Sequence, residues 1–409
     1  MFLETLRRPP PRALSLMTFN LLAPCYFRHG GRLESDDETA FLSRAQAAIQ
    51  AIQREQCDVV CLQEFWFQRA YQRAFRSAFD ATHYLHTAQR PNDKEDGLAV
   101  LVDKRKFELH YVENVDLVGE AGDRVALLLH VATKWNRASV QLPQRSFLVV
   151  NSHLTFPHSH LYASLRLNQI DRVLAAVRKY IARQALHDVP VLLCGDFNDY
   201  DDPVYRLVTK HGFASMFAHR HGREARITHC NHNNREVGVD FIFGARLGSS
   251  VPAVGVPSSA ESSSSSIHGD ASSAMLRHAA LTLDGNNQSR SEDEPRLQLQ
   301  PVDCHLVPRR LPDVARLKRP QFGHDWRHVQ SPLLLRDEEQ LVDYWRMVSD
   351  HRPLVATFDM MHQERSSRQC NSEERKVLSF ENVRASAAEM KARLEHVIPM
   401  DIATDGLTP

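Results

Sequence analysis

The sequence predicts an α/β fold, and three observations support that prediction. Short apolar runs typical of buried strands recur along the chain, and amphipathic segments with helical spacing lie between several of them. Polar residues follow many of the apolar runs where the strand would end. With 409 residues and 43% hydrophobic content, the chain has enough apolar surface to form a substantial core.

The first half of the chain opens with a strand, helix, strand unit. Residues 14–20 form an apolar run ending in Asn20, residues 38–56 carry apolar side chains at helical spacing, and residues 58–64 form a second apolar run ending in Glu64. The elements expected next are a helix at 68–79 and strands at 97–102, 124–131 and 146–153.

The second half continues the alternation. A long helix is expected at 164–186, because its apolar residues form one stripe. The apolar run at 191–194 predicts a strand buried on both faces, which Gly195 interrupts. The remaining expected elements are a helix starting near Pro203 and strands at 239–243 and 354–358.

A change in composition divides the chain into segments. Serine, asparagine and glycine dominate residues 248–300, and this composition predicts that the segment is a disordered insertion. Residues 301–345 are expected to be partly ordered, with a helix candidate at 333–345. The predicted domain thus comprises residues 12–246 and 346–360. Residues 361–409 form a charged tail with a helix candidate near 381–397.

The overall composition narrows the possible partners and compartment. Fifty basic and fifty acidic residues give no net charge, so polyanion binding would depend on a local surface. The seven scattered cysteines favour a reducing compartment, and we expect the cytoplasm, with the nucleus as the alternative. The arginine-containing N-terminus lacks a signal-peptide cleavage pattern, and no apolar run is long enough to span a membrane.

The candidate site consists of polar residues that lie at the ends of the predicted apolar strands. Asp196 and Asn198 lie two residues apart and would point the same way on an extended backbone. Carboxylate and amide oxygens suit a hard cation, Mg²⁺ or Mn²⁺, and a histidine can stabilise or protonate a phosphoryl oxygen. The set therefore predicts hydrolysis of a phosphate ester. Its members are Asn20, Glu64, His153, Asp196, Asn198, Asp240, Asp350 and His351.

Six motifs containing these residues resemble the endonuclease/exonuclease/phosphatase superfamily, and they occur in that family's order. They are Thr-Phe-Asn20, Leu-Gln-Glu64, Asn-Ser-His153-Leu, Gly-Asp196-Phe-Asn198, Val-Asp240-Phe-Ile and Ser-Asp350-His351-Arg-Pro-Leu. Within the superfamily, Leu21-Leu-Ala-Pro-Cys-Tyr26 and Leu165-Arg-Leu-Asn-Gln169 are similar to the branch of carbon-catabolite-repressor-type deadenylases and nocturnin.

The resemblance implies a DNase I-like, four-layered α/β sandwich in which two packed mixed sheets are flanked by helices. It implies that Glu64 is the principal metal ligand, with Asn20 and Asp350 beside the cation. It also implies that Asp196 orients or deprotonates the attacking water and that Asn198 and His153 hold phosphate oxygens. Asp240 would pair with His351, and protonated His351 would stabilise the transition state.

Each assignment has a structural alternative. Asn20 and Asp350 could serve as turn residues, Asp240 could form a simple salt bridge, and His153 could be a buried structural histidine. Arg124 either reaches a substrate phosphate or forms a surface ion pair. Trp66 and Phe67 offer stacking faces, although packing is the favoured interpretation. The run His229-Cys230-Asn-His232 lacks the paired ligand blocks of a structural zinc module.

Three functional hypotheses follow from the sequence. The resemblance favours a magnesium-dependent 3′ exoribonuclease or deadenylase acting on RNA. The alternatives are a phosphodiesterase or phosphatase that acts on sphingomyelin or inositol phosphates, and a non-catalytic interaction protein. Neither an EF-hand calcium loop nor a leucine-rich-repeat docking region is found in the sequence.

Overall fold

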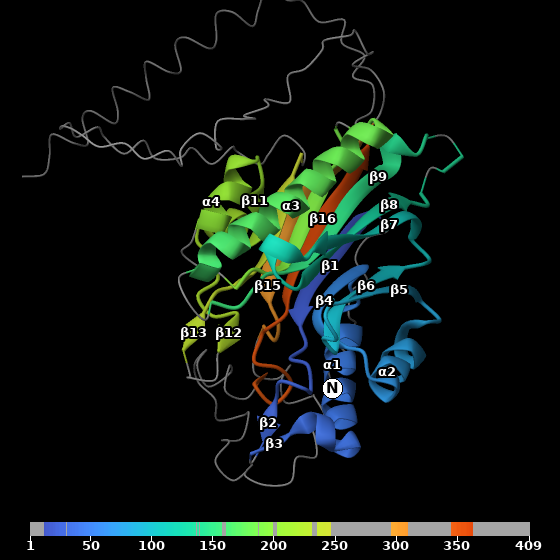
Figure 1. The fold of residues 1–409 in the computed structure, drawn as a ribbon. Coiled ribbons are helices and arrows are strands. Elements are labelled where there is room, and N and C mark those ends of the chain that lie inside the picture. The colour runs from blue at the N-terminus through green and yellow to red at the C-terminus, as the bar shows by residue number, and fades with distance from the viewer. Residues whose placement is uncertain are drawn as a thin grey trace, which may run out of the picture. The chain divides into compact units, whose positions relative to one another are not determined.

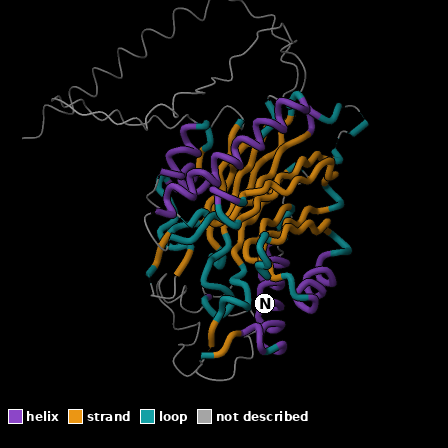
Figure 2. Tube along the Cα trace, viewed as in Figure 1, coloured by secondary structure: helices purple, strands orange, loops and turns teal. Residues whose placement is uncertain are grey.

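A computed structural model shows alternating helices and strands (Figure 2). It describes residues 12–29, 31–135, 137–138, 140–157, 161–186, 188–198, 203–230, 235–246, 296–309 and 345–362. The α-helices are α1 (Glu38–Glu55), α2 (Arg69–Phe79), α3 (Leu161–Gln184), α4 (Pro203–Lys210) and α5 (Met216–His221). Short 3₁₀ turns are formed by η1 (Glu34–Asp36), η2 (Gly119–Ala121) and η3 (Pro143–Arg145).

Two six-stranded mixed sheets form the centre of the described fold. The first has the order β15 (Leu297–Leu306), β16 (Leu354–His362), β1 (Ala13–Asn20), β4 (Val59–Trp66), β6 (Asp96–Asp103) and β5 (His83–Gln89). The second has the order β11 (Ala214–Ser215), β14 (Asp240–Ala245), β10 (Val191–Asp196), β9 (Ser146–His153), β8 (Arg124–Thr133) and β7 (Phe107–Leu117). Two short hairpins pair β2 (Arg28–His29) with β3 (Arg32–Leu33) and β12 (His229–Cys230) with β13 (Glu236–Val237).

The sheets and helices stack in four layers (Figure 1). Side chains from both sheets, such as Leu16, Val100, Leu127 and Leu192, form the central core. A second core joins the first sheet to α1 and α2, and a third joins the other sheet to α3 and α4. Inner strands such as β4 and β9 bury both faces, so they are mainly apolar rather than alternating. The predicted four-layered α/β sandwich is confirmed.

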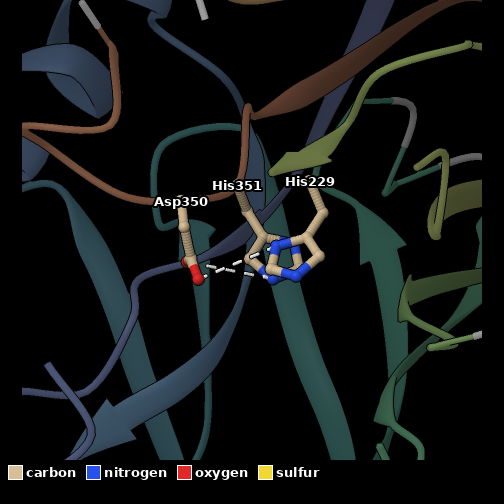
Figure 3. Close-up of side chains that lie close together, drawn as sticks. All are labelled: His229, Asp350 and His351. Atoms are coloured by element: carbon tan, nitrogen blue, oxygen red, sulfur yellow. Dashed lines mark ion pairs between the residues drawn. The ribbon is translucent and has the colours of Figure 1, made fainter. Parts of the chain in front are cut away.

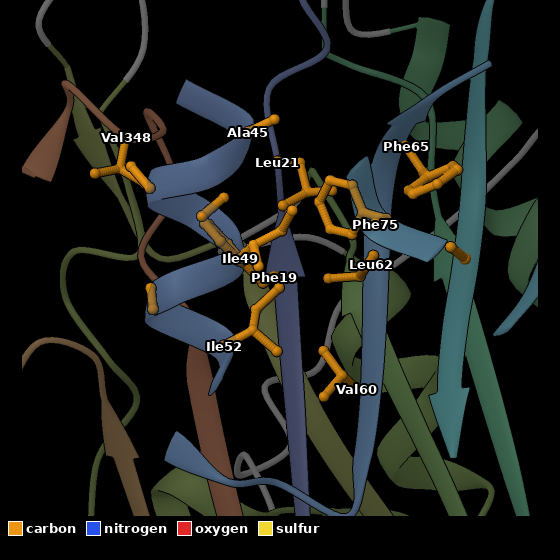
Figure 4. Packing of buried hydrophobic residues seen from close by; sticks show 14 of the residues in the cluster. Phe19, Leu21, Ala45, Ile49, Ile52, Val60, Leu62, Phe65, Phe75 and Val348 are labelled. Atoms are coloured by element: carbon orange, nitrogen blue, oxygen red, sulfur yellow. The ribbon is translucent and has the colours of Figure 1, made fainter. Parts of the chain in front are cut away.

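The packing of α1 shows how one outer layer is held. Figure 4 shows Ala45, Ile49 and Ile52 on the helix face that meets Phe19 and Leu62 of the first sheet. These positions recur at helical spacing, so one stripe of α1 can be buried while the opposite stripe stays polar. Asp37 accepts a hydrogen bond from the Ala40 N–H and thereby caps the helix.

A polar bridge crosses the otherwise apolar space between the sheets. The Asn151 side chain, from β9, donates hydrogen bonds to the carbonyls of Leu62 and Ala99 at 3.0 and 3.1 Å. Its oxygen accepts a hydrogen bond from Gln63 Nε2 at 2.7 Å. Since buried amides are stable only when they are paired, this arrangement fixes the position of β9 relative to β4 and β6 near the site.

The structure corrects part of the predicted domain organisation. The disordered insertion was predicted to extend to residue 300, but Leu297–Leu306 forms β15, an edge strand paired with β16. The prediction is therefore wrong for residues 297–300, where Leu297 and Leu299 are buried. Strands β5 and β7 were not predicted. Residues 248–295 and the helix candidate at 381–397 lie outside the described residues, as does the candidate at 333–345 except for Trp345. No helix in the described ranges is long and apolar enough to cross a membrane.

Candidate active site

The predicted site residues converge at one end of the two sheets because the strand registers align them. In the second sheet, Asp196 is paired with Asp240 on one side and with His153 on the other. In the first sheet, Asn20 lies opposite Gln63, next to Glu64. Polar side chains at the ends of neighbouring strands therefore come together, although they are as much as 331 positions apart in the sequence, as with Asn20 and His351.

A cleft of about 630 Å³ opens over these strand ends. Its wall includes seven of the predicted residues, whereas Asn20 and Asp240 are buried beneath it. The seven are Glu64, Arg124, His153, Asp196, Asn198, Asp350 and His351. The remaining lining residues are Leu22, Tyr26, Phe27, Arg28, Phe156, His229, Cys230 and Arg346. Arg124 is buried, so the alternative of a surface ion pair does not hold for it.

Backbone irregularities aim two of the acceptors into the cleft. Glu64 lies at a bulge between Gln63 and Phe65, and its φ is +52°. Asn198 has a φ of +51° immediately after β10. Left-handed backbone is uncommon for residues with a side chain, and it clusters at functional sites because it points side chains where regular strand geometry would not. Gly195 is required beside them, since a Cβ there would lie 1.8 Å from the Ser152 carbonyl oxygen.

Asn20 connects two of the acidic residues of the site, Glu64 and Asp196. Its amide nitrogen donates to Glu64 Oε1 at 3.2 Å and to Asp196 Oδ2 at 2.9 Å. Glu64 Oε2 accepts a hydrogen bond from the Ala23 N–H at 2.9 Å. Burial, followed by the charges of Asp96 and Asp350, raises the pKa of Glu64 above its usual range. A divalent cation would favour the ionised form of this carboxylate.

His351 lies between the carboxylates of Asp240 and Asp196. Its Nδ1 is 2.9 Å from Asp240 Oδ2, and its Nε2 is 3.6 Å from Asp196 Oδ2. Burial alone would lower the pKa of His351, but these two carboxylates raise it well above the usual range. The predicted pairing of Asp240 with His351 is therefore present, and the imidazole is held in its cationic form.

Asp196 has the environment of a base that titrates near neutrality. Burial raises its pKa most, His351 lowers it, Asp240 raises it, and the balance places it at about 7. Its Oδ1 accepts a hydrogen bond from the Asn198 N–H at 2.9 Å. The other oxygen, Oδ2, faces His153 Nε2 at 3.4 Å. Asp196 is thus fixed in orientation while it remains on the cleft wall.

Arg124 and His153 form the cationic side of the cleft. Arg124 Nη1 lies 3.1 Å from His153 Nδ1. Burial, and next the Arg124 charge, lowers the pKa of His153 well below its usual range, so His153 is neutral. Burial and the nearby Arg90 lower the pKa of Arg124 to about 10, which still leaves it protonated at neutral pH. A buried guanidinium in a cleft can bind a phosphate oxygen.

The donor set fits a divalent cation. Glu64, Asp196, Asp240 and Asp350 contribute four carboxyl groups, and among these Asp240 Oδ1 and Asp350 Oδ1 are buried with no hydrogen-bond partner among the residues that the structure describes. The Asp196, Asp240 and His351 ligand atoms lie within 4.8 Å of one another, as do those of His229, Asp350 and His351. Burial raises the pKa of Asp350, and an unpartnered buried carboxylate oxygen is costly unless a cation or a donor meets it.

His229 is one of the cleft-lining residues that the sequence interpretation did not assign to the site. It comes from β12 and stacks on His351 with ring centroids 3.9 Å apart (Figure 3). The histidine-rich run around it was the available signal, but that run was assessed only as a zinc module. His232 lies outside the described residues. Trp66, by contrast, packs on Phe41 and Tyr71 and does not line the cleft, so the packing interpretation of Trp66 is confirmed.

Comparisons with known proteins agree with this geometry. Residues 17–273 match the Endonuclease/Exonuclease/phosphatase family. An uncharacterized calcium-binding protein of Arabidopsis thaliana is 32% identical over 245 residues, which cover 56% of this chain and 50% of that protein. Nocturnin of Drosophila melanogaster is 25% identical over 206 residues, covering 48% of this chain and 30% of nocturnin. The chain thus spans about half, or less, of the length of these relatives.

Solved structures give the same fold. The human Nocturnin catalytic domain has a TM-score of 0.50 and 17% identity, covering 87% of this chain and all of that domain. ANGEL2, a 2′,3′-cyclic phosphatase, has a TM-score of 0.50 and 16% identity, and the match covers 85% of this chain and 95% of the ANGEL2 chain. The fold, the order of the motifs and the matched residues agree. The chain therefore belongs to the endonuclease/exonuclease/phosphatase family, whose members hydrolyse phosphate esters.

Proposed function

We propose that this chain is a Mg²⁺- or Mn²⁺-dependent hydrolase of RNA phosphodiesters that acts from the 3′ end. The observation that supports hydrolysis most directly is that Asp196 and His351, with Asp240 behind His351, lie on the wall of a cleft that also contains Glu64 and Arg124. The choice of RNA rests on the motifs shared with the nocturnin branch and on the similarity to nocturnin and to Angel homolog 2 proteins.

Each residue of the cleft has its own role in the proposed hydrolysis. Asp196 Oδ2, held by Asn20, accepts a proton from the attacking water. His351, charged and oriented by Asp240, stabilises the negative charge that develops on the phosphoryl oxygens. Asn198 and Arg124 bind non-bridging oxygens of the phosphate, and neutral His153 supports Arg124.

Glu64 and Asn20, with Asp350 nearby, would hold the cation. When bound, it supplies positive charge that polarises the phosphoryl group. The donors are mainly oxygens, which suits Mg²⁺ or Mn²⁺.

A substrate panel tests the proposal. Purified full-length protein with Mg²⁺ is offered 3′-polyadenylated RNA, RNA ending in a 2′,3′-cyclic phosphate, sphingomyelin and inositol phosphates. We expect stepwise shortening of the polyadenylated RNA from its 3′ end. Removal of the cyclic phosphate alone would point to the activity named for ANGEL2, and turnover of the lipid alone would contradict the RNA assignment. Internal cleavage would contradict exonucleolytic action.

Glu64→Gln provides the matched inactive control. It keeps the size of the side chain and can still accept from the Ala23 N–H, but it removes the negative charge. If the variant keeps its fold, measured by circular dichroism, and loses turnover, contaminating nucleases are excluded. A variant that retains wild-type turnover would refute the metal role of Glu64.

A further inference from the structure

Tyr26 is an exposed aromatic side chain on the cleft wall. Three large apolar side chains are exposed in the described ranges, Tyr26, Val302 and Met361, and of these Tyr26 alone lines the cleft. Its exposed fraction is 46%. Single exposed apolar side chains are common on protein surfaces, so exposure alone indicates little. What distinguishes Tyr26 is that hydrogen bonds at its hydroxyl and its backbone hold it in this place.

The hydroxyl of Tyr26 is bonded to the end of the first sheet. It donates to Asp96 Oδ1 at 2.6 Å, and Asp96, the first residue of β6, is fully buried. Burial, and next the Asp96 charge, raises the pKa of Tyr26, so the hydroxyl stays protonated and remains a donor. Asp96 also accepts a hydrogen bond from Arg90 Nη1 at 3.0 Å, so a guanidinium already compensates its charge. Asp96 therefore does not depend on Tyr26 as its only donor.

The backbone around Tyr26 is fixed as well. The Tyr26 N–H donates to the Ala23 carbonyl at 2.8 Å, and the Glu34 N–H donates to the Phe27 carbonyl at 2.9 Å. The guanidinium carbon of Arg44 lies 5.3 Å from the centroid of the Phe27 ring. A ring that is held at both its hydroxyl and its backbone loses little conformational freedom when a flat ligand stacks on it.

Arg28 places a cation on the same wall. It lines the cleft and is exposed. Among the residues that the structure describes, its side chain has no hydrogen-bond or ion-pair partner. An unpaired guanidinium can bind a phosphate oxygen. A fixed aromatic ring beside such a cation is the combination that holds single-stranded nucleic acid, because the ring stacks on a base and the cation binds the backbone.

We propose that Tyr26 stacks on a nucleobase of the RNA substrate and that Arg28 binds a phosphate near that base, other than the phosphate that is hydrolysed. The inference rests on the proposed function and adds a substrate subsite to its catalytic groups. Because every base has a flat face, the subsite requires a base at one position of the strand but discriminates little among the bases. Tyr26 thereby sets where the strand lies relative to Asp196 and His351.

Removing either ring, that of the protein or that of the substrate, tests the stacking. Oligoadenylates with one abasic nucleotide, placed at successive positions from the 3′ end, are bound to full-length protein in which Glu64→Gln blocks turnover, and fluorescence anisotropy gives their affinities. Adding Tyr26→Leu should weaken binding of the intact oligoadenylate about 5- to 150-fold, the usual contribution of one stacked base. With the RNA that is abasic at the stacked position, Tyr26→Leu should have no further effect, because its partner is already absent. If Tyr26→Leu weakens every RNA by the same factor, or weakens none, the proposal is overturned.

Two variants separate stacking from structural effects. Tyr26→Phe loses the bond to Asp96 but keeps the aromatic face, so it should retain most of the position-specific affinity. A loss as large as that of Tyr26→Leu would assign the effect to the hydroxyl and overturn the stacking. Tyr205 is the matched control, because its hydroxyl also contacts a carboxylate, that of Glu224 at 2.7 Å, but Tyr205 does not line the cleft. Tyr205→Leu should leave all the affinities unchanged, and a loss equal to that of Tyr26→Leu would contradict a specific role for Tyr26.

Arg28→Gln should have a different signature. It should weaken binding of intact and abasic RNAs alike, because the contact is with the backbone. The slope of log affinity against log salt concentration should become less negative by about 0.7, the value for one phosphate contact on a single strand. An unchanged slope would overturn the role of Arg28.

Turnover by protein with Glu64 intact separates this inference from the proposed function. Tyr26→Leu should raise KM for polyadenylated RNA more than it lowers kcat, since the ring binds the strand in the ground state as well as in the transition state. If the wild type shortens this RNA and Tyr26→Leu does so with unchanged KM, only the subsite is overturned. If the wild type neither binds nor shortens RNA, the proposed function fails and the subsite fails with it.

Discussion

At the scale of single residues, the environment of each acid determines what it can do. Asp196 and Asp240 are buried, whereas the side chain of Asp350 is partly exposed. Asp196 and Asp350 both line the cleft and lie near His351, but the pKa of Asp196 is about 7. Asp240 is beneath the cleft and acts through His351. Similar carboxyl groups thus acquire different roles from their neighbours.

Activity should depend on pH through Asp196 and His351. The base Asp196 must be deprotonated, so kcat/KM should rise as pH increases through about 7. His351 must stay protonated, so kcat/KM should fall once pH exceeds its raised pKa. Asp240→Asn removes the carboxylate that raises that pKa, and its falling limb should move to lower pH. A pH profile of both proteins checks this, and an unmoved falling limb would contradict the role of Asp240.

Removing the imidazolium should affect chemistry far more than stability. His351→Ala is expected to reduce kcat by about two to four orders of magnitude, the usual loss for a charge that acts mainly in the transition state. Steady-state kinetics measure the loss, and thermal unfolding checks the fold. The assignment fails if the folded variant retains a near-normal kcat.

The sequence could predict most of the site because strand ends are visible in it. Asn20, Glu64, His153 and Asp196 each follow an apolar run, and parallel neighbours such as β9 and β10 bring their ends to one edge. His229 follows no apolar run and belongs to a two-residue strand, so its position depended on a tertiary pairing that periodicity does not encode.

At the scale of elements, buried pairs support the loop that forms one wall of the cleft. Arg44 of α1 forms a 2.5 Å ion pair with Glu34. It also donates to the carbonyls of Leu21 and Leu22, immediately after β1. The helix thereby fixes the segment that leads to Tyr26 and Phe27 on the cleft wall.

Breaking the buried ion pair between Arg44 and Glu34 should destabilise the fold. Arg44→Met leaves Glu34 buried without a counter-charge and is expected to destabilise the fold by about 3–5 kcal/mol. Arg178→Met, which removes an exposed partner of Asp171, should cost less than about 1 kcal/mol. Urea unfolding of both variants gives the comparison. Equal losses would show that burial of the Arg44 pair does not matter.

The edge strand β15 offers a second element-scale test. Leu299 is fully buried in the central core, whereas Val302 on the same strand is 48% exposed. Leu299→Ala should therefore cost about 2–5 kcal/mol in unfolding free energy, and Val302→Ala much less. If Leu299→Ala has no measurable effect in urea unfolding, β15 is not part of the folded core.

Composition explains why β15 and β7 escaped prediction. Residues Leu297–Leu306 follow a long serine-rich segment, and the pairing with β16 that orders them lies 48 to 65 residues away in sequence. In β7, polar and apolar residues alternate only until the irregularity between Leu109 and Tyr111 shifts the register. Long, continuously apolar strands such as β9 and β10 carried a stronger signal.

At the scale of the whole molecule, segments distant in sequence form one sheet. Strand β16 pairs with β1 on one side and with β15 on the other. The residues that join these strands in sequence include the predicted serine-rich insertion, whose disorder stays a prediction.

Limited proteolysis tests that arrangement. Cleavage is expected first within residues 248–295, where the composition predicts disorder. The two fragments should stay associated, because β16 of the C-terminal fragment remains hydrogen-bonded to β1 of the N-terminal fragment within the first sheet. Native gel filtration followed by denaturing electrophoresis distinguishes association from separation. Fragments that separate under native conditions would contradict the sheet order.

Pairing of the last described strand with the first has a consequence for biosynthesis. Asp350 and His351 directly precede β16, which reaches its place only by docking on β1. A ribosome releases β1 early and β16 more than 300 codons later, so a nascent chain can form most of the second sheet yet hold no imidazolium beside Asp196. The active site is therefore incomplete until Asp350, His351 and β16 have been translated, and a transcript truncated before the His351 codon would yield a protein that lacks the imidazolium.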